Sequence, residues 1–264
     1  MQKEYIYMKN SLKLRQSNNL ILATHEMNIQ QMRLFFYACS QYQGDLTIDV
    51  TIEEIYNVLT EDTGNRGGNQ RERIIETIPT LMRNAIVHIE DEDAVRWSVV
   101  LTDSYILKDG KTVRFKFNKS IQKELEELRG YTWMYLSQLT GMRSTYSVRL
   151  YEFFAMRLGS QNIKETFDFD TNNLRLYLDC TKKYKEFFDF DKRVLKVANK
   201  EINEKSNIKM SYKKIKTGRS VTSVRFTFSW KNKADVIDVK TEVHQEPMNH
   251  AEQMELKEFL KEFE

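Results

Sequence analysis

The chain has 264 residues, 41% of them hydrophobic and 12% aromatic, which is the composition of a globular protein with one large core or two ordinary ones. No apolar stretch approaches the roughly 18 residues of a membrane-spanning helix, and the start is too polar for a secretory signal, so we expect a cytoplasmic protein without a membrane partner. Cys39 and Cys180 have no Cys or His neighbour at metal spacing. We therefore expect reduced thiols, no metal and no cofactor.

Positive charge is concentrated in one part of the sequence. The chain carries a net charge of +3, but residues 182–231 contain fifteen Lys or Arg against five Asp or Glu, whereas residues 234–264 contain three against nine. A basic segment on a nearly neutral body is typical of a protein with one face that follows a polyanion. A solvated lysine-rich surface is the alternative interpretation.

The chain begins with a polar stretch and then alternates helical and strand patterns. Residues 1–17 predict a flexible N-terminus. Apolar side chains at three- and four-residue steps predict a helix over 28–42, and alternation predicts a strand over 45–50. Thr51 and Glu54 then form a capping-box pattern that begins a short helix.

A glycine-rich loop over 63–71 leads into the next predicted helix. Its glycines permit close backbone approach to DNA phosphate, although a plain flexible connector fits equally well. The candidate DNA contacts here are Arg66, Asn69, Arg71 and Arg73.

Four alternating segments follow and predict one small antiparallel sheet. They are residues 85–90, 95–101, 105–107 and 112–117. A helix is predicted over 118–128, and the segment 131–143 is too apolar for a floppy linker, so we expect it to be packed between two domains.

The same order of elements returns about 120 residues later, with a helix over 144–158, a strand over 165–170 and a short helix over 171–178. After a turn at 182–189, a longer helix is predicted over 191–205. Two strands, 208–215 and 221–230, flank a basic hairpin tip. Helix, strand, capped helix, longer helix and a strand pair is the order of a winged helix-turn-helix, so the sequence predicts an α+β fold with tandem winged-helix domains, each a helical bundle with a small antiparallel sheet.

These patterns divide the chain into five parts. They are a flexible N-terminus (1–17), a first winged-helix domain (18–130), a packed connector (131–143), a second winged-helix domain that is the main DNA-binding one (144–232), and an acidic tail with an amphipathic helix pattern (233–264).

The second domain carries three clusters of candidate DNA contacts on consecutive elements. A helix in the major groove presents its first turns to base edges, while flanking Lys and Arg meet phosphate. The start of the first helix, where hydroxyls suit phosphate, supplies Ser144, Tyr146 and Arg149. The turn, the longer helix and the wing supply Lys182, Lys183, Lys185, Lys192, Arg193, Lys196, Asn199, Lys200, Lys213, Lys214, Lys216 and Arg219.

Sequence motifs of enzymes are missing from the chain. No glycine-rich loop ends in Lys-Ser or Lys-Thr, and the four histidines do not pair at metal spacing, so we expect no nucleotide hydrolysis and no catalytic site.

A dense motif in the second domain resembles the initiator replication proteins of iteron plasmids. It comprises Ser144–Glu152, Leu174–Arg175, Tyr184, Phe187, Phe190, Lys192–Leu195, Ala198, Glu201–Asn203, Tyr212, Ile215–Lys216, Gly218–Arg219, Val221 and Phe226. The resemblance covers roughly residues 10–230 and implies two winged-helix domains that bind repeated origin sequences as monomers and repress their own promoter as dimers.

The resemblance also implies roles for individual residues. Lys192 and Arg193 would lie at the groove-reading start of the recognition helix, with Arg149 and Ser144 near phosphate. Asp191 departs from the family pattern, and its carboxylate would accept from cytosine or cap the helix.

The leading hypothesis is a plasmid replication initiator that binds iterons in double-stranded DNA, nucleates origin opening and carries out no chemistry. Its expected partners are origin DNA, a second copy of itself, and a host initiator, helicase or primase. A winged-helix transcriptional repressor without origin function and an enzyme that nicks the origin are the alternatives.

Overall fold

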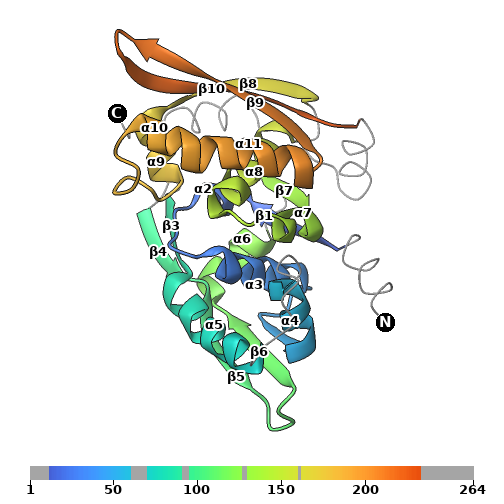
Figure 1. Cartoon of the computed structure of the whole chain (residues 1–264). Coiled ribbons are helices and arrows are strands. Elements are labelled where there is room, and N and C mark those ends of the chain that lie inside the picture. The colour runs from blue at the N-terminus through green and yellow to red at the C-terminus, as the bar shows by residue number, and fades with distance from the viewer. Residues whose placement is uncertain (1–11, 61–69, 91–94, 127–129, 160–161, 233–264) are drawn as a thin grey trace. The chain divides into compact units, whose positions relative to one another are not determined.

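The computed structural model describes residues 12–60, 70–90, 95–126, 130–159 and 162–232. It divides into two compact units, one formed by residues 1–127 and 133–145 and the other by 128–132 and 146–264. Figure 1 shows the elements of both units, and each unit is described by itself.

The first unit contains most of the helices and strands that the sequence predicts. Its elements are β1 (Lys13–Ser17), α2 (Asn18–Leu22), α3 (Ile29–Ser40), β2 (Thr47–Thr51), α4 (Ile52–Thr60), α5 (Gln70–Asn84), β3 (Ile86–Glu90), β4 (Val95–Val99), β5 (Leu101–Ile106), β6 (Thr112–Phe117), η1 (Lys119–Ile121), α6 (Gln122–Glu126), β7 (Tyr131–Tyr135, across which the unit boundary falls) and α7 (Leu136–Gly141).

Local chemistry explains where two of these helices begin. Asn28 caps α3 by accepting from the backbone of Gln31, whose side chain accepts from the Asn28 backbone in return. Thr51 and Glu54 make the predicted reciprocal pair at the start of α4, with bonds of 2.7 and 3.1 Å between each side chain and the other's backbone N–H. The capping-box prediction is confirmed.

Two predictions for the first unit are wrong. Residues 13–17 are not a flexible end but strand β1, in which Leu14 is buried, and β1 pairs with β7. The four later strands form two sheets rather than one: β3 pairs with β4, while β6 lies between β2 and β5. Alternation in a sequence identifies strands but carries no information about which strand pairs with which.

The second unit repeats part of the order of the first, from α3 to β6, without counterparts of β3 and β4. Its elements are α8 (Thr145–Leu158), β8 (Lys164–Asp170), α9 (Thr171–Tyr177), α10 (Phe187–Phe190), η2 (Asp191–Leu195), α11 (Lys196–Lys205), β9 (Ile208–Thr217) and β10 (Ser220–Trp230).

The two three-stranded sheets have the same topology. β2-β6-β5 in the first unit and β8-β10-β9 in the second each place the second strand of the terminal hairpin in the middle, antiparallel to both neighbours. The strand that leads into a short helix lies at one edge. This shared topology confirms the internal duplication that the sequence predicts.

An aromatic core holds the sheet of the second unit against its first helix. The ring of Phe154 on α8 stacks on that of Phe228 on β10, with 4.3 Å between the ring centres. The ring centres of Phe153 and of Phe169 on β8 are 5.1 Å apart. These side chains are almost completely buried. The helices α9 to α11 and the β9–β10 hairpin are therefore built on a rigid base.

Candidate nucleic-acid interface

The longest helical segment of the second unit begins four residues earlier than the sequence predicts. Helical backbone runs from Phe187 through α10, η2 and α11 to Lys205, so the expected turn at 182–189 ends at Glu186. Within η2 the Lys196 N–H donates to the carbonyl of Asp191, which is the i to i+5 bond of a π-helical turn. Lys192 and Arg193 consequently lie in the second turn of the helix, not at its first residues.

This helix has one buried face and one exposed basic face. The predicted inward residues Val194, Leu195, Ala198 and Ile202 are all completely buried. The exposed residues on the other side are Phe188, Lys192, Arg193, Lys196 and Lys200, with Glu204 and Lys205 exposed in the last turn, whereas Asn199 is half-buried. The guanidinium of Arg193 lies 3.8 Å from the carboxylate of Asp189, one turn earlier.

The β9–β10 hairpin forms the wing that the sequence predicts. Gly218 forms its tip with a φ of 62°, a left-handed conformation that glycine adopts without strain. Side chains of β9 alternate between two faces: Tyr212, Lys214 and Lys216 share the face toward the helix, whereas Lys213 lies on the other face, directly across from Arg225. The structure therefore brings Lys214 and Lys216 to the helix side but separates Lys213 from them, and Arg219 is exposed at the tip.

Asp191 joins the helix to the wing. The residue is 3% exposed. Its carboxylate accepts from the Tyr212 hydroxyl at 2.7 Å and from the Lys214 Nζ at 2.9 Å, and it lies 3.9 Å from the Lys196 Nζ. Burial acts to raise the pKa of Asp191, but the hydrogen bonds from Tyr212 and Lys214 outweigh it and hold the pKa below its usual value. Neither sequence-based role for Asp191, a helix cap or a cytosine contact, is correct, because the carboxylate is buried in the middle of a helical segment.

Arg149 is also misplaced by the sequence interpretation. The side chain is 5% exposed, with its guanidinium 3.7 Å from the Glu152 carboxylate and 4.3 Å from the centre of the Tyr177 ring. The Tyr177 hydroxyl donates to the Arg149 carbonyl at 2.9 Å. Arg149 is thus a buried structural residue of α8 and does not lie on a phosphate-binding surface.

The turn before the helix is held by specific contacts. Lys182, Lys183 and Lys185 are exposed, while the Arg175 Nη1 donates to the Lys183 carbonyl at 3.0 Å. Tyr184 has a φ of 53°, and its ring meets the ring of Tyr146 edge-on at 6.1 Å. These contacts fix the path of the basic turn.

The remaining predicted residues near α8 and in the first unit are only partly placed. Ser144 is partly exposed directly before α8, and Tyr146 is partly buried beneath Tyr184. Arg73 is exposed on α5. Arg66, Asn69 and the side chain of Arg71 lie outside what the structure describes.

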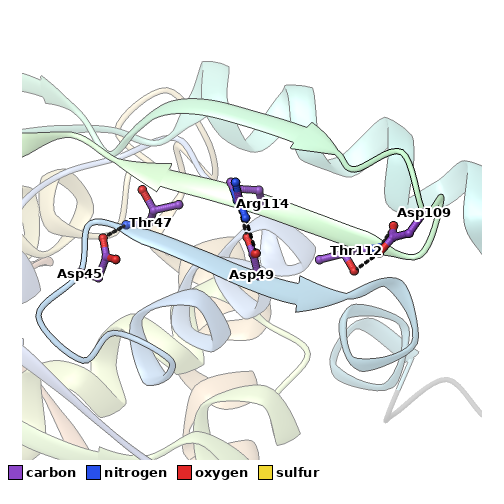
Figure 2. Close-up of polar contacts among 6 residues, drawn as sticks. All are labelled: Asp45, Thr47, Asp49, Asp109, Thr112 and Arg114. Atoms are coloured by element: carbon purple, nitrogen blue, oxygen red, sulfur yellow. Dashed lines mark hydrogen bonds and ion pairs between the residues drawn. The ribbon is translucent and has the colours of Figure 1, made fainter.

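The wing of the first unit carries basic residues that the sequence interpretation missed. Figure 2 shows Asp109 and Thr112 at the β5–β6 turn. The Asp109 carboxylate accepts from the backbone N–H of Lys111 at 2.8 Å and of Thr112 at 2.9 Å. Lys108, Lys111 and Lys116 are exposed on this hairpin. The Asp109-Gly110 turn was recognisable from sequence, and the lysines around it were the available signal for a basic wing.

Sites for other chemistry are not apparent in the described residues. Among them no group of three or more His, Cys, Asp or Glu is arranged to hold a metal ion, and both cysteines are buried thiols. None of the described helices is long and apolar enough to cross a membrane.

Comparison with known proteins agrees with this architecture. Residues 13–155 match the model of the initiator replication protein WH1 domain, and residues 170–228 match that of the initiator Rep protein WH2 domain. No curated protein sequence matches significantly.

Solved structures that match the chain include the following two. A Pi initiator protein crystallised with iteron DNA has a TM-score of 0.66 at 15% identity, over 84% of this chain and 98% of that one. A structure of domains 2 and 3 of RctB has a TM-score of 0.45 at 13% identity, over 77% of this chain and 81% of that one. The first likeness confirms the tandem winged-helix fold. With WH1 and WH2 matched in order over most of its length, the chain belongs to the family of initiator replication proteins.

Proposed function

We propose that the chain initiates plasmid replication by binding iterons in double-stranded DNA. The observation that carries the proposal is the exposed basic face of the helix Phe187–Lys205, continued by Lys214 and Lys216 on the adjoining wing. A helix of this kind fits the major groove, and a basic wing beside it meets the neighbouring phosphates. The similar Pi initiator, crystallised with iteron DNA, supports the same ligand.

The proposal assigns no catalytic step to this chain. The sequence lacks a nucleotide-binding loop, so strand separation beyond the bound repeats would require a host helicase. The proposed partners therefore include a host initiator, helicase or primase. The proposed place of action is the cytoplasm, where a plasmid replicates.

Autorepression belongs to the same proposal as a second consequence of DNA binding. A second copy bound beside the first, at a sequence within the chain's own promoter, would block transcription there. A repressor without origin function would bind such a promoter site but would not support maintenance of a plasmid that depends on it.

Footprinting of the full chain on the DNA that flanks its own reading frame tests the proposal. We expect protection of several short direct repeats, with affinity that falls steeply as salt rises. Protection of one inverted repeat alone would favour the repressor, and magnesium-dependent strand cleavage would favour a nicking enzyme. Uniform, sequence-independent coverage would overturn the proposal.

A further inference from the structure

Phe188 is the most exposed large apolar side chain that the structure describes. It is 71% exposed and is the second residue of the helix that begins at Phe187. Aromatic side chains have a large apolar area and are usually buried. An exposed one on the basic helix face is therefore expected to be buried by the ligand that binds there.

The neighbours of Phe188 are anchored, which leaves Phe188 as the outward ring of this turn. Phe187 and Phe190 contact each other at 5.9 Å between ring centres. The Lys214 Nζ lies 5.4 Å from the centre of the Phe187 ring, and the Arg175 guanidinium lies 4.4 Å from that of Phe190. Phe190 is completely buried and Phe187 is half-buried against it, so both of these rings have partners within the unit.

The charged surroundings of Phe188 favour a polyanionic partner over an apolar protein surface. Lys185 precedes it, and Lys192 lies one helical turn after it on the same exposed face, followed by Arg193. Of the nearby acids, Glu186 is exposed and Asp189 lies 3.8 Å from Arg193. An apolar ring within such a basic helix face lies where base edges, rather than phosphates, are the available neighbours.

The C5-methyl group of thymine is the one apolar group that bases present in the major groove. From this placement we infer that Phe188 contacts a thymine methyl and thereby selects a T·A pair within the bound repeat. The inference rests on the proposed function and adds a specificity-determining residue to it. The phenyl ring has no donor or acceptor for a base edge, so its selectivity comes from the methyl alone.

Replacing thymine by deoxyuridine tests the inference, because the exchange removes only the methyl group. The full chain first selects duplexes from a random-sequence pool, and each thymine of the selected sequence is then exchanged in turn. Affinities are measured for the unchanged chain, for Phe188→Ala and for Ile163→Ala. Ile163 is 52% exposed in the same unit but lies outside the helix and the wing, so this variant is the matched control.

At one thymine, or at two adjacent ones, we expect the exchange to lower the affinity about fourfold, which is the factor for one buried methyl group. This loss should occur both for the unchanged chain and for Ile163→Ala. For Phe188→Ala the thymine-to-uracil ratio at that position should fall to one. Because each ratio is taken within one protein, a general loss of affinity cancels.

Three results would overturn the inference. If every exchange is neutral for the unchanged chain, or if Phe188→Ala keeps the full discrimination, Phe188 does not read a methyl group, although the proposed function stands. If no sequence is selected from the pool, the proposed function fails as well.

Discussion

Arg225 on β10 lies directly across from Asp168 on β8 and donates two hydrogen bonds of 2.6 Å to its carboxylate. Arg114 makes the same pair of 2.6 Å bonds to Asp49 at the equivalent place in the first unit, as Figure 2 shows. Asp49 lies two residues before Thr51, and Asp168 lies two residues before Asp170. The side-chain oxygens of Thr51 and Asp170 each accept from a backbone N–H in the first turn of the next helix. The duplication thus extends to a specific ion pair on each sheet.

Because the Asp168–Arg225 pair is half-exposed, we expect Arg225→Ala to lower the free energy of unfolding only slightly. The bonds from Arg225 hold the pKa of Asp168 below its usual value, so the contribution is present above the unfolded pKa and is lost as pH falls through the folded one. A double-mutant cycle with Asp168→Ala, measured by urea denaturation at pH 7 and pH 3, checks both statements. A coupling energy that is the same at both pH values would contradict them.

Arg193 should contribute to sequence preference. If its guanidinium pairs with guanine, Arg193→Ala will reduce the difference in binding free energy between selected and random duplexes by about 1–3 kcal/mol. Competition binding with the two kinds of DNA measures this difference. Equal weakening on both would identify Arg193 as a phosphate contact.

The two faces of β9 provide a charge-matched test of the wing. Lys216 shares the helix-facing side with Lys214, whereas Lys213 lies on the other side with Arg225. We expect Lys216→Ala to reduce the slope of log affinity against log salt by about 0.9, the value for one phosphate contact. Lys213→Ala, which removes the same charge, should leave the slope unchanged, and equal slopes for the two variants would exclude this orientation of the wing.

Asp191 should matter for stability because it connects the helix Phe187–Lys205 to the wing. Loss of its charged hydrogen bonds in Asp191→Asn is expected to cost about 1.5–3 kcal/mol of unfolding free energy, and Tyr212→Phe about 1 kcal/mol. The lowered pKa of Asp191 means that this stability is present above the unfolded pKa and is lost as pH falls through the folded pKa. Between pH 7 and pH 3, the melting temperature should therefore fall less for Asp191→Asn than for the unchanged chain. Parallel curves of melting temperature against pH would refute the assignment.

Glu152 gives a pH dependence of the opposite sign. Burial raises the pKa of its carboxyl to about 7, although the neighbouring Arg149 acts to lower it. The stability that this group contributes is present below its unfolded pKa and is lost as pH rises through about 7. Glu152→Gln should match the unchanged chain in unfolding free energy at pH 4, below the unfolded pKa, and exceed it at pH 8. The reverse order at pH 8 would mean that the ion pair with Arg149 dominates.

Local patterns in the sequence predicted most of the elements that form the candidate interface. The apolar spacing of Val194, Ala198 and Ile202 identified the buried face of the long helix, and the glycine at 218 marked the wing tip. Such patterns are reliable because the direction of a side chain follows from backbone geometry over a few residues.

The sequence by itself determined the duplication, the periodic elements and the concentration of positive charge in residues 182–231, since each depends on neighbours along the chain. Only the tertiary structure decided that β6 pairs with β2, that Arg149 is buried beside Tyr177, and that Asp191 binds Tyr212 and Lys214 across from it. Those outcomes depend on contacts between residues far apart in the chain. The sequence shows that Arg149 and Asp191 carry charged side chains. Packing alone decides whether such a group faces solvent or a buried partner.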